Sequence, residues 1–326
     1  MLNNRIIKTT VTFTDETSRV FYSAGGKFSD GKVFMRQDFS VMNYINSASG
    51  GLGTGEIKLW NLTDNSSRQI EAKGNTILIE AGWEGKTGKI FEGEISSVIR
   101  TKPAPAEANI ITTLFCVSGL SKLQKRICEV PTVSQLTKIS SLLRQIADDA
   151  GLFLDIDREI SGAVENLSFN GNIVQVLKKL STQFKFNFYF DQTHLYIRTA
   201  TSIDNVQIVK EYNPTDGLLD IPVVTEMGID LKIFLDPNIH SGDGFRLTSQ
   251  FANFNIAGLN FVDRVRGDQI YTFGRQVNNN RYVGKYQALQ VSHNGSSHED
   301  TWETSIVAMG EGNLENIVNT ERLDNV

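Results

Sequence analysis

Residues 217–249 read GLLDIPVVTEMGIDLKIFLDPNIHSGDGFRLTS, and this stretch decides the class of fold that we expect. Apolar residues occupy every second position in two runs, Gly228–Leu235 and Gly244–Thr248, which is the pattern of half-buried strands. Asp236–Asn238 lies between the runs and supplies turn chemistry, because proline fixes φ and the Asp and Asn side chains bond their own backbone. The stretch therefore predicts a strand, a long turn and a second strand.

The bulk composition is that of an ordinary globular protein with two or three domains. The chain has 326 residues, of which 40% are apolar and 21% charged. Its formal net charge of −5 argues against a protein that mainly grips phosphates, although nucleic acid could pass an acidic wall without sticking. The start has no apolar signal-peptide core, and no run approaches the ~18 apolar residues of a membrane span. We expect a protein that stays in the cytosol unless it leaves as part of an assembly.

The first part of the chain, residues 1–118, is rich in predicted strands separated by turns, which suggests a sandwich or barrel. Residues 82–88 are predicted to form a Gly-rich hairpin loop, and residues 102–106 a stiff surface connection. Residues 47–55, SASGGLGTG, are predicted to be a loop tip or a hinge. The predicted strands are residues 5–13, 32–40, 56–62, 75–81, 89–100 and 110–117.

Residues 119–200 change character and predict a small α+β layer. Apolar residues recur at helical spacing over 135–150, beginning with Leu136, and again over 173–184. Ser134 is placed to cap the first helix and Gly151 to end it. The order helix, strand, strand, helix, strand, strand gives a small sheet with helices on one face. Its predicted strands are residues 152–157, 167–169, 186–191 and 194–198.

Residues 201–312 return to strands, and residues 313–326 form a polar tail that we expect to be frayed or ordered by a partner. The predicted strands of this third part are residues 207–212, 225–235, 245–250, 270–274, 285–294 and 302–309.

The residue types that carry chemistry do not assemble into a site. The Gly-rich run 50–55 lacks the spacing of a phosphate loop and precedes a strand instead of a helix. His293 and His298 are five residues apart across an Asn-Gly turn, which indicates a solvated hairpin loop more than a metal site. Asp155 and Asp157 share a strand face but have no aromatic cleft beside them. We predict no catalytic residues, no cofactor and no metal.

Cysteine and tryptophan are two further residue types that bear on the interpretation. Cys116 and Cys128 are too few for a disulfide framework, so we interpret them as small buried hydrophobic residues. Trp60, Trp83 and Trp302 are more informative, because Trp60 alternates with buried positions and must lie on the outer sheet face. Its cover is either another layer of the same chain or a neighbouring subunit. The residues predicted to lie at protein interfaces are Trp60, Trp83, Gly82, Gly85, His293 and Asn294.

Several blocks of the sequence, in their order along the chain, resemble baseplate hub proteins of tailed bacteriophages. Residues 55–62 (GEIKLWNL), 77–83 (ILIEAGW) and 90–95 (IFEGEI) look like the first barrel of these hubs. Three blocks resemble the small α/β module that also occurs in secretins, and three others resemble the second barrel. The α/β blocks are residues 160–162, 167–171 and 176–180, and the second-barrel blocks are residues 217–249, 285–293 and 302–304.

The resemblance implies an α+β, mostly β fold, in which two tube-protein-like β-barrel domains flank a small α/β domain. The domains would be residues 1–118, 119–200 and 201–312, followed by the tail 313–326. It also implies a structural virion protein without enzymatic activity. Such a hub forms a homotrimeric, pseudo-sixfold ring that joins the tail tube protein to the central spike protein, contacts other baseplate proteins and leaves a channel for DNA ejection. We therefore expect it in the virion baseplate, and in the host cytoplasm during assembly.

Three other functions remain as alternatives. A hub of a related contractile injection system, such as a bacteriocin or a secretion spike, would share the same sequence features. A secretin-like periplasmic component would need a signal peptide, which the start of this sequence lacks. A tail-associated hydrolase would need a converging set of acid, base or nucleophile, which the sequence does not indicate.

Overall fold

The computed structural model describes two compact units of the chain. Unit 1 comprises Met1–Ala200 together with His293–Trp302, and unit 2 comprises Thr201–Ser292 together with Glu303–Val326. The described residues are 5–24, 33–34, 36–44, 52–106, 108–119, 130–133, 136–156, 159–165, 167–169, 172–191, 193–199, 207–225, 228–249, 253–255 and 284–310.

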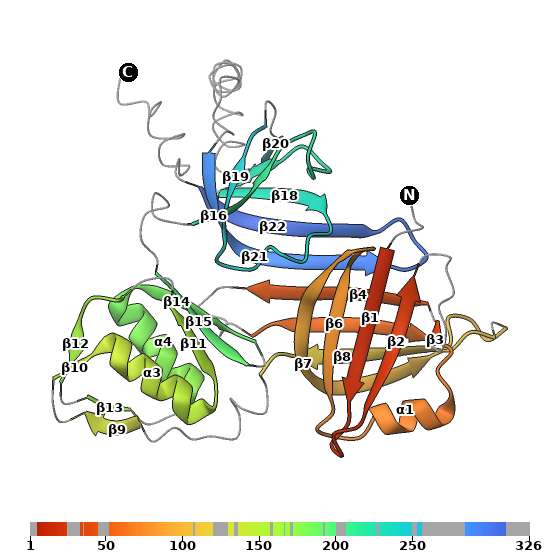
Figure 1. Cartoon of the computed structure of the whole chain (residues 1–326), viewed down its shortest axis with the longest axis horizontal. Helices are drawn as coiled ribbons and strands as arrows, with labels where there is room; N and C mark the ends of the chain where they lie inside the picture. Colours follow the sequence, from red (N-terminus) through yellow and green to blue (C-terminus); the bar gives the residue numbers. More distant parts are fainter. Residues whose placement is uncertain are drawn as a thin grey trace, which may run out of the picture. The chain divides into compact units, whose positions relative to one another are not determined.

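The larger part of unit 1 is a sheet with the order β4-β5-β8-β7-β6-β1-β2-β3 (Figure 1). All neighbours are antiparallel except the short β2–β3 pair. The elements are β1 (Arg5–Thr12), β2 (Ser18–Ala24), β3 (Val33–Phe34), β4 (Gln37–Tyr44), β5 (Thr54–Trp60), α1 (Asp64–Ile70), β6 (Thr76–Trp83), β7 (Lys86–Thr101) and β8 (Ile111–Val117).

The core of this sheet is formed by residues at alternate strand positions, most of which are apolar. Every second residue of β1, β5 and β6 is buried, as the two-residue period of a strand requires. Most of the fully buried side chains on the inner face are aliphatic or aromatic, and Cys116 lies among them as predicted. Thr9 is a polar exception, and its hydroxyl donates to the buried Gln37 side chain at 2.7 Å. The predicted surface connection at 102–106 is confirmed, since it joins β7 to β8 and is largely exposed. Members of this core include Ile7, Val11, Ile57, Leu59, Ile77, Ile79 and Leu114.

One prediction in this sheet needs a boundary correction, and one element was missed. The hairpin predicted at residues 82–88 is present, but its loop is shorter, because Trp83 pairs with Lys86 and only Glu84 and Gly85 remain in the turn. Helix α1 was missed, because its seven residues, DNSSRQI, are too polar and too few for a helical apolar period. Its start is nonetheless encoded locally, since the Thr63 side chain accepts a hydrogen bond from the Ser66 N–H.

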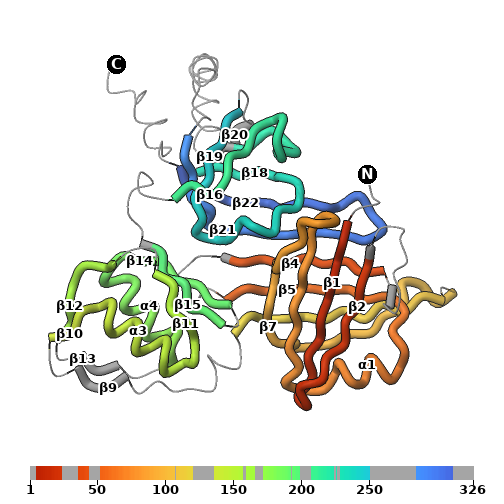
Figure 2. The backbone as a smooth tube through the Cα atoms, in the orientation of Figure 1, coloured from red at the N-terminus to blue at the C-terminus, as the bar shows by residue number. Residues whose placement is uncertain are grey.

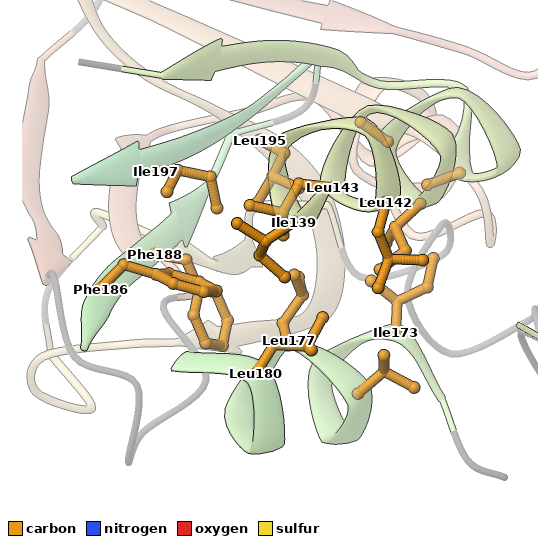
Figure 3. Close-up of a cluster of buried hydrophobic side chains, with 14 of the residues drawn as sticks. Ile139, Leu142, Leu143, Ile173, Leu177, Leu180, Phe186, Phe188, Leu195 and Ile197 are labelled. Atoms are coloured by element: carbon orange, nitrogen blue, oxygen red, sulfur yellow. The ribbon is translucent and has the colours of Figure 1, made fainter. Parts of the chain in front are cut away.

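The remainder of unit 1 is a small α/β layer, shown in Figure 3 around its buried cluster. Two helices pack their apolar sides against one face of the sheet β11-β15-β14. Strand β15 pairs parallel with β11 and antiparallel with β14. The elements are β9 (Val130–Val133), β10 (Thr137–Lys138), α3 (Ile139–Ala150), β11 (Phe153–Ile156), β12 (Ala163–Val164), β13 (Leu167–Phe169), α4 (Ile173–Phe184), β14 (Phe186–Phe190) and β15 (His194–Thr199).

The two helices show how far helical periodicity predicts boundaries. Helix α4 has the predicted bounds, and Asn172 and Gln175 form a capping box at its start. Helix α3 begins four residues later than predicted, because residues 137–138 pair with β12 as a strand. Leu136, expected on the buried stripe, is therefore outside the helix and 72% exposed. Gly151 ends α3 in the left-handed conformation, as predicted.

Unit 2 is a second sheet, with the order β20-β17-β18-β22-β21-β19-β16. Figure 2 labels most of its strands on the backbone tube. The pairs β17–β20 and β16–β19 are parallel. The elements are β16 (Ile208–Tyr212), β17 (Val223–Thr225), β18 (Gly228–Phe234), β19 (Gly244–Leu247), β20 (Asn253–Asn255), β21 (Gly284–Ser296) and β22 (Trp302–Gly310). Its buried cluster includes Tyr212, Ile229, Leu231, Ile233, Phe245, Leu247, Val291 and Ile306.

The two alternating runs of the opening stretch are the strands β18 and β19, as predicted. They do not pair with each other, because β18 lies between β17 and β22 whereas β19 lies between β16 and β21. The turn after β18 has the predicted chemistry: the Asp236 side chain accepts hydrogen bonds from the backbone N–H and the side-chain amide of Asn238. Lys210 and Tyr212 also bind this carboxylate, at 2.6 and 3.2 Å.

Several predictions fall outside the described residues. They concern the strand at 270–274, the tail 313–326, Cys128, Ser134, Asp157 and most of the Gly-rich stretch 47–55. Of its described residues, Thr54 and Gly55 belong to β5, where Gly55 is buried next to the ring of Phe91.

Candidate assembly interfaces

Residues His293–Trp302 form the turn between β21 and β22 and the positions on either side of it. They make many side-chain contacts and lie at or near several of the predicted interface residues. We call this segment the 293–302 tip. Ser296 organises the turn: its hydroxyl accepts the N–H groups of His298 and Glu299, and its own N–H donates to the Thr301 carbonyl at 3.0 Å. The Asn-Gly turn expected at 294–295 is wrong, because both residues continue strand β21.

Arg5 holds the backbone of the tip. Its Nη1 and Nη2 atoms donate to the carbonyl oxygens of Glu299 and Asp300 at 2.7 and 3.0 Å. Burial lowers the pKa of this guanidinium, although the nearby Asp300 charge acts in the opposite direction. Arg36 forms an ion pair with the Glu299 carboxylate. Two arginines of unit 1 therefore bind the acidic end of the tip.

The tip also lies against the first residues of β4. Ser297 exchanges two hydrogen bonds with the Gln37 backbone, one from its N–H and one to its hydroxyl, both at 2.9 Å. The Ser296 hydroxyl donates to the Asp38 carboxylate at 2.7 Å. Since one partner in each contact lies more than 250 residues away along the chain, local sequence could not have indicated them.

Trp302 anchors the tip in an aromatic cluster and is only 3% exposed. Its ring lies 6.0 Å from those of Phe39 and Trp83, edge to face in both cases. The Arg5 guanidinium lies 5.2 Å from its ring centroid. Gly295 permits this packing, because a Cβ there would lie 2.4 Å from the Phe39 ring. Such aromatic pairs each contribute about 0.5–1.5 kcal/mol beyond the area they bury.

The structure brings some of the predicted interface residues together. Trp83 contacts the tip through Trp302, and His293 and Asn294 belong to the tip itself. His293 is buried within the chain, whereas Asn294 is half-buried. The part of the loop that is solvated, as predicted, comprises residues 298–301.

Gly82 and Gly85 have different roles in the β6–β7 hairpin. Gly82 is buried at φ 153°, and a Cβ there would lie 2.2 Å from the Lys86 carbonyl oxygen. Gly85 is exposed at φ 81°, in the turn, with open space around its Cα. Both positions therefore favour glycine on conformational grounds, independently of any partner.

Trp60 is half-buried, and its cover includes a residue of the same chain. The Arg36 guanidinium lies 4.3 Å from the Trp60 ring centroid, within the range of a cation–π interaction. Arg36 also binds Glu299, so the outer face at Trp60 and the 293–302 tip share one arginine. The link between the tip and Trp60 could not be predicted, because nothing in the residues around Arg36 indicates what its side chain binds.

A second polar cluster joins the first sheet to the small α/β layer. Asp191 accepts the backbone N–H groups of Thr193 and His194 and the Tyr196 hydroxyl, and its carboxylate lies 3.3 Å from Lys89 Nζ. Burial raises the pKa of Asp191, but these hydrogen bonds and the Lys89 charge outweigh it and lower the pKa below its usual value. The cluster positions the hairpin β14–β15 and leaves the carboxylate fully paired.

The described ranges were compared with the requirements of a metal cluster and of a membrane-spanning helix. No group of three or more His, Cys, Asp or Glu side chains there could hold a metal ion. Asp155, considered for hydrolysis, is paired with Arg198 at 3.2 Å. Among the described helices, none has the length and apolar character that crossing a membrane requires.

Comparison with solved structures identifies the class of fold. A 43 kDa tail protein of prophage MuSo2 from Shewanella oneidensis matches with a TM-score of 0.51 and 8% identity, over 92% of this chain and 95% of that chain. A tail protein from Neisseria meningitidis MC58 matches with a TM-score of 0.55 and 7% identity, over 95% and 98% of the two chains. The fold is therefore one that phage tail proteins use.

A third similar structure comes from a secretion system. It is an Escherichia coli component of the type VI secretion system, described as similar to the T4 bacteriophage tail proteins gp27 and gp5. It matches with a TM-score of 0.50 and 8% identity, over 85% of this chain and 73% of that chain. At such low identity the three structures establish the fold alone. No curated protein sequence matches the chain.

The sequence model of one family matches residues 55–266, which is more than half of the chain. The chain belongs to this family, baseplate hub gp41. The resemblance inferred from the sequence is thus confirmed, and the protein is a mostly β structural component of the phage tail.

Proposed function

We propose that three copies of this chain form a ring that joins the tail tube to the central spike of the baseplate. The observation that carries the proposal is the hub family match over residues 55–266. Each chain would offer two β-barrel domains, residues 1–118 and 201–312, so that three chains make a pseudo-sixfold ring. In this proposal, residues 119–200 would be the small α/β domain and residues 313–326 the polar C-terminal tail.

Physical arguments support a closed ring. The sheets of both units have outer strands with unpaired edges among the described residues, such as β3 and β16. Edges of this kind can be paired across subunits, and a closed cyclic assembly leaves none exposed. The net charge of −5 suits a channel through which DNA passes during ejection without sticking to the wall.

The partners in this proposal are the chain itself, the tail tube protein, the spike protein and other baseplate proteins. Assembly would take place in the host cytoplasm before the hub becomes part of the virion. Trp60, Trp83, Gly82, Gly85, His293 and Asn294 stay proposed interface positions. Of these, Gly85 is exposed and Trp60, Trp83 and Asn294 are half-buried, so these four positions are more accessible to a partner than the buried Gly82 and His293.

The test is the mass of the purified chain, measured by light scattering at several concentrations. One chain has a mass of 36.3 kDa, so a trimer has a mass of about 109 kDa. A trimer that shows a sixfold-like ring in electron micrographs would support the proposal. A chain that stays monomeric alone and also with its tube and spike proteins would refute it.

A second candidate is the hub of a related contractile injection device. It is favoured by the structural similarity to a component of the type VI secretion system. The genes beside this one distinguish the two, since capsid and packaging genes indicate a phage. A third, less supported candidate is a tail-associated hydrolase. Loss of turbidity of cell-wall suspensions on adding the purified chain would favour it over the structural role.

A further inference from the structure

Several dipeptides of this chain have a sequence that can rearrange its own backbone. In an Asp-Gly or Asn-Gly pair the glycine nitrogen can attack the carbonyl carbon of the preceding side chain, because glycine has no Cβ to hinder the approach and reaches many backbone conformations. The sequence has five such pairs, and those at 30–31 and 170–171 lie outside the described residues. The described pairs are Asp216–Gly217, Asp243–Gly244 and Asn294–Gly295.

Two of the described pairs are held by strands. Gly244 is buried at the start of β19, which lies between β16 and β21, and the Asp243 carboxylate accepts the His240 N–H at 2.8 Å. Asn294 and Gly295 both belong to β21, and Gly295 is buried. Ring closure at either pair would first require the strand to open locally, which costs free energy.

The pair Asp216–Gly217 lies in a turn that closes on Asn213. The N–H of Asp216 donates to the Asn213 carbonyl at 3.0 Å, and the Asn213 N–H donates back to the Asp216 carbonyl at 3.3 Å. The Leu218 N–H donates to the same Asn213 carbonyl at 3.4 Å. Between these donors, the Gly217 N–H has no hydrogen-bond partner among the described residues. The nitrogen that would attack is therefore not held by a hydrogen bond.

Exposure and backbone conformation also set this pair apart. Asp216 is exposed, so water reaches its carboxyl group. Gly217 has a φ of 87°, a conformation that glycine adopts without strain. Exposed turns of this kind are the parts of a fold that open and change most easily.

We propose that Asp216 is a site of spontaneous isoaspartate formation. The Gly217 nitrogen bonds to Cγ of the protonated Asp216 carboxyl group, and the carboxyl hydroxyl and the amide proton leave together as water. Water then adds to the cyclic imide. When it breaks the bond between the Gly217 nitrogen and the backbone carbonyl carbon of Asp216, the main chain continues through Cγ. Water is the only other reactant, and no atom is oxidised or reduced. The inference concerns one copy of the chain and does not depend on the proposed ring.

The rearranged turn would fit unit 2 less well. Its main chain is longer by one carbon atom, the Cβ of Asp216. The Gly217 carbonyl accepts the Phe234 N–H at 2.9 Å, and Leu218 packs on the buried cluster of unit 2. A longer main chain displaces both residues relative to β18, and the register beside a strand decides which side chains reach the core.

The test places one reactive dipeptide at three positions of the full-length chain. Asp216→Asn and Asp243→Asn each make an Asn-Gly pair, and Asn294–Gly295 is present naturally. Asn-Gly reacts by the same attack but releases ammonia in place of water, a change of mass that peptide mass spectrometry detects. Each chain is incubated near neutral pH, folded and in denaturant. The rate in denaturant is the reference for each position, because it contains the effect of the neighbouring residues without that of the fold.

We expect folding to slow the reaction at position 216 by less than about tenfold. At positions 243 and 294 it should slow the reaction at least about tenfold more than at 216, because a local opening that costs 1.4 kcal/mol already reduces the reactive population tenfold. Circular dichroism checks each variant. If Asp243→Asn does not fold, Asn294 of the natural chain supplies the comparison with a strand.

The natural chain provides a second measurement. Isoaspartate should accumulate in the peptide that contains Asp216, as labelling with an isoaspartyl methyltransferase followed by peptide mapping would show. Asp216→Glu should prevent it, since the longer side chain would have to close a larger ring.

Two outcomes would overturn the inference. One is equal slowing at all three positions on folding, because the turn would then protect Gly217 as well as a strand protects its residues. The other is a natural chain that forms isoaspartate at Asp216 in denaturant but not when folded. A chain that is monomeric at every concentration would refute the ring and leave this inference standing.

Discussion

Removing the side chain of Trp302 should destabilise unit 1 strongly. Trp302 is 3% exposed and contacts Phe39, Trp83 and Arg5. Truncating a buried tryptophan to alanine costs about 3–5 kcal/mol, a total that includes the cavity it leaves. A domain of about 200 residues loses roughly 2–4 °C of melting temperature per kcal/mol, so Trp302→Ala should lower the unit 1 transition by about 6–20 °C.

Differential scanning calorimetry is the assay, because a chain with two units need not unfold in one step. Trp302→Phe should recover part of the loss. Trp60→Ala is the matched control, since Trp60 is half-buried and its described aromatic contact is one cation–π interaction with Arg36, worth about 0.5–1 kcal/mol at such a site. Proteolysis at exposed residues 298–301 should also become faster in Trp302→Ala. A shift below about 2 °C, or one no larger than that of Trp60→Ala, would refute the claim that the tip is an integral part of unit 1.

Three further predictions concern single side chains. Gly82→Ala should lower the free energy of unfolding by about 2 kcal/mol or more, because its Cβ would lie 2.2 Å from a backbone carbonyl oxygen. Gly85→Ala, with open space around it but a φ of 81°, should lower it by about 1 kcal/mol. Urea unfolding compares the two variants, and equal losses would contradict the geometry. Asp191 has a folded pKa below its unfolded value of about 3.8, so its contribution to stability is complete above that value and is lost as pH falls through the folded pKa. Asp191→Asn should therefore lower the melting temperature at pH 7, and by progressively less as the pH falls below the unfolded pKa. A loss independent of pH would contradict this. Burial raises the pKa of Cys116 to about 12, so this thiol should resist alkylation at pH 8 in the folded chain and react in denaturant, as mass spectrometry of the labelled peptide would show.

Patterns within a dozen residues predicted the elements well. Helix α4 was predicted over its full length, because its apolar stripe and its capping residues lie inside the helix or next to it. Strands β18, β21 and β22 were located by alternation to within a few residues. Errors arose where a non-local partner decided the outcome: the pairing of residues 137–138 with 163–164 delayed the start of α3. Helix α1 was missed because seven polar residues carry no period.

The candidate interfaces were less predictable than the strands and helices, because their contacts join residues that are far apart in the sequence. Trp83 and the 293–302 tip were each noted in the sequence, but their meeting through Trp302 depends on a contact between residues more than 200 positions apart. Arg5 and Arg36 were not singled out, because an arginine in a strand has no local sign of what it will bind.

The position of the tip in the chain has a consequence for biosynthesis. Phe39 and Trp83 leave the ribosome early, whereas Trp302, which packs between them, is translated about 220 residues after Trp83. At roughly 5–20 residues per second, about 10–40 s pass between the synthesis of Trp83 and that of Trp302. During that interval the apolar surface around Phe39 and Trp83 lacks the cover that Trp302 provides in the folded chain. Nascent chains stalled before residue 302 should therefore bind chaperones more than chains released just after the tip has emerged.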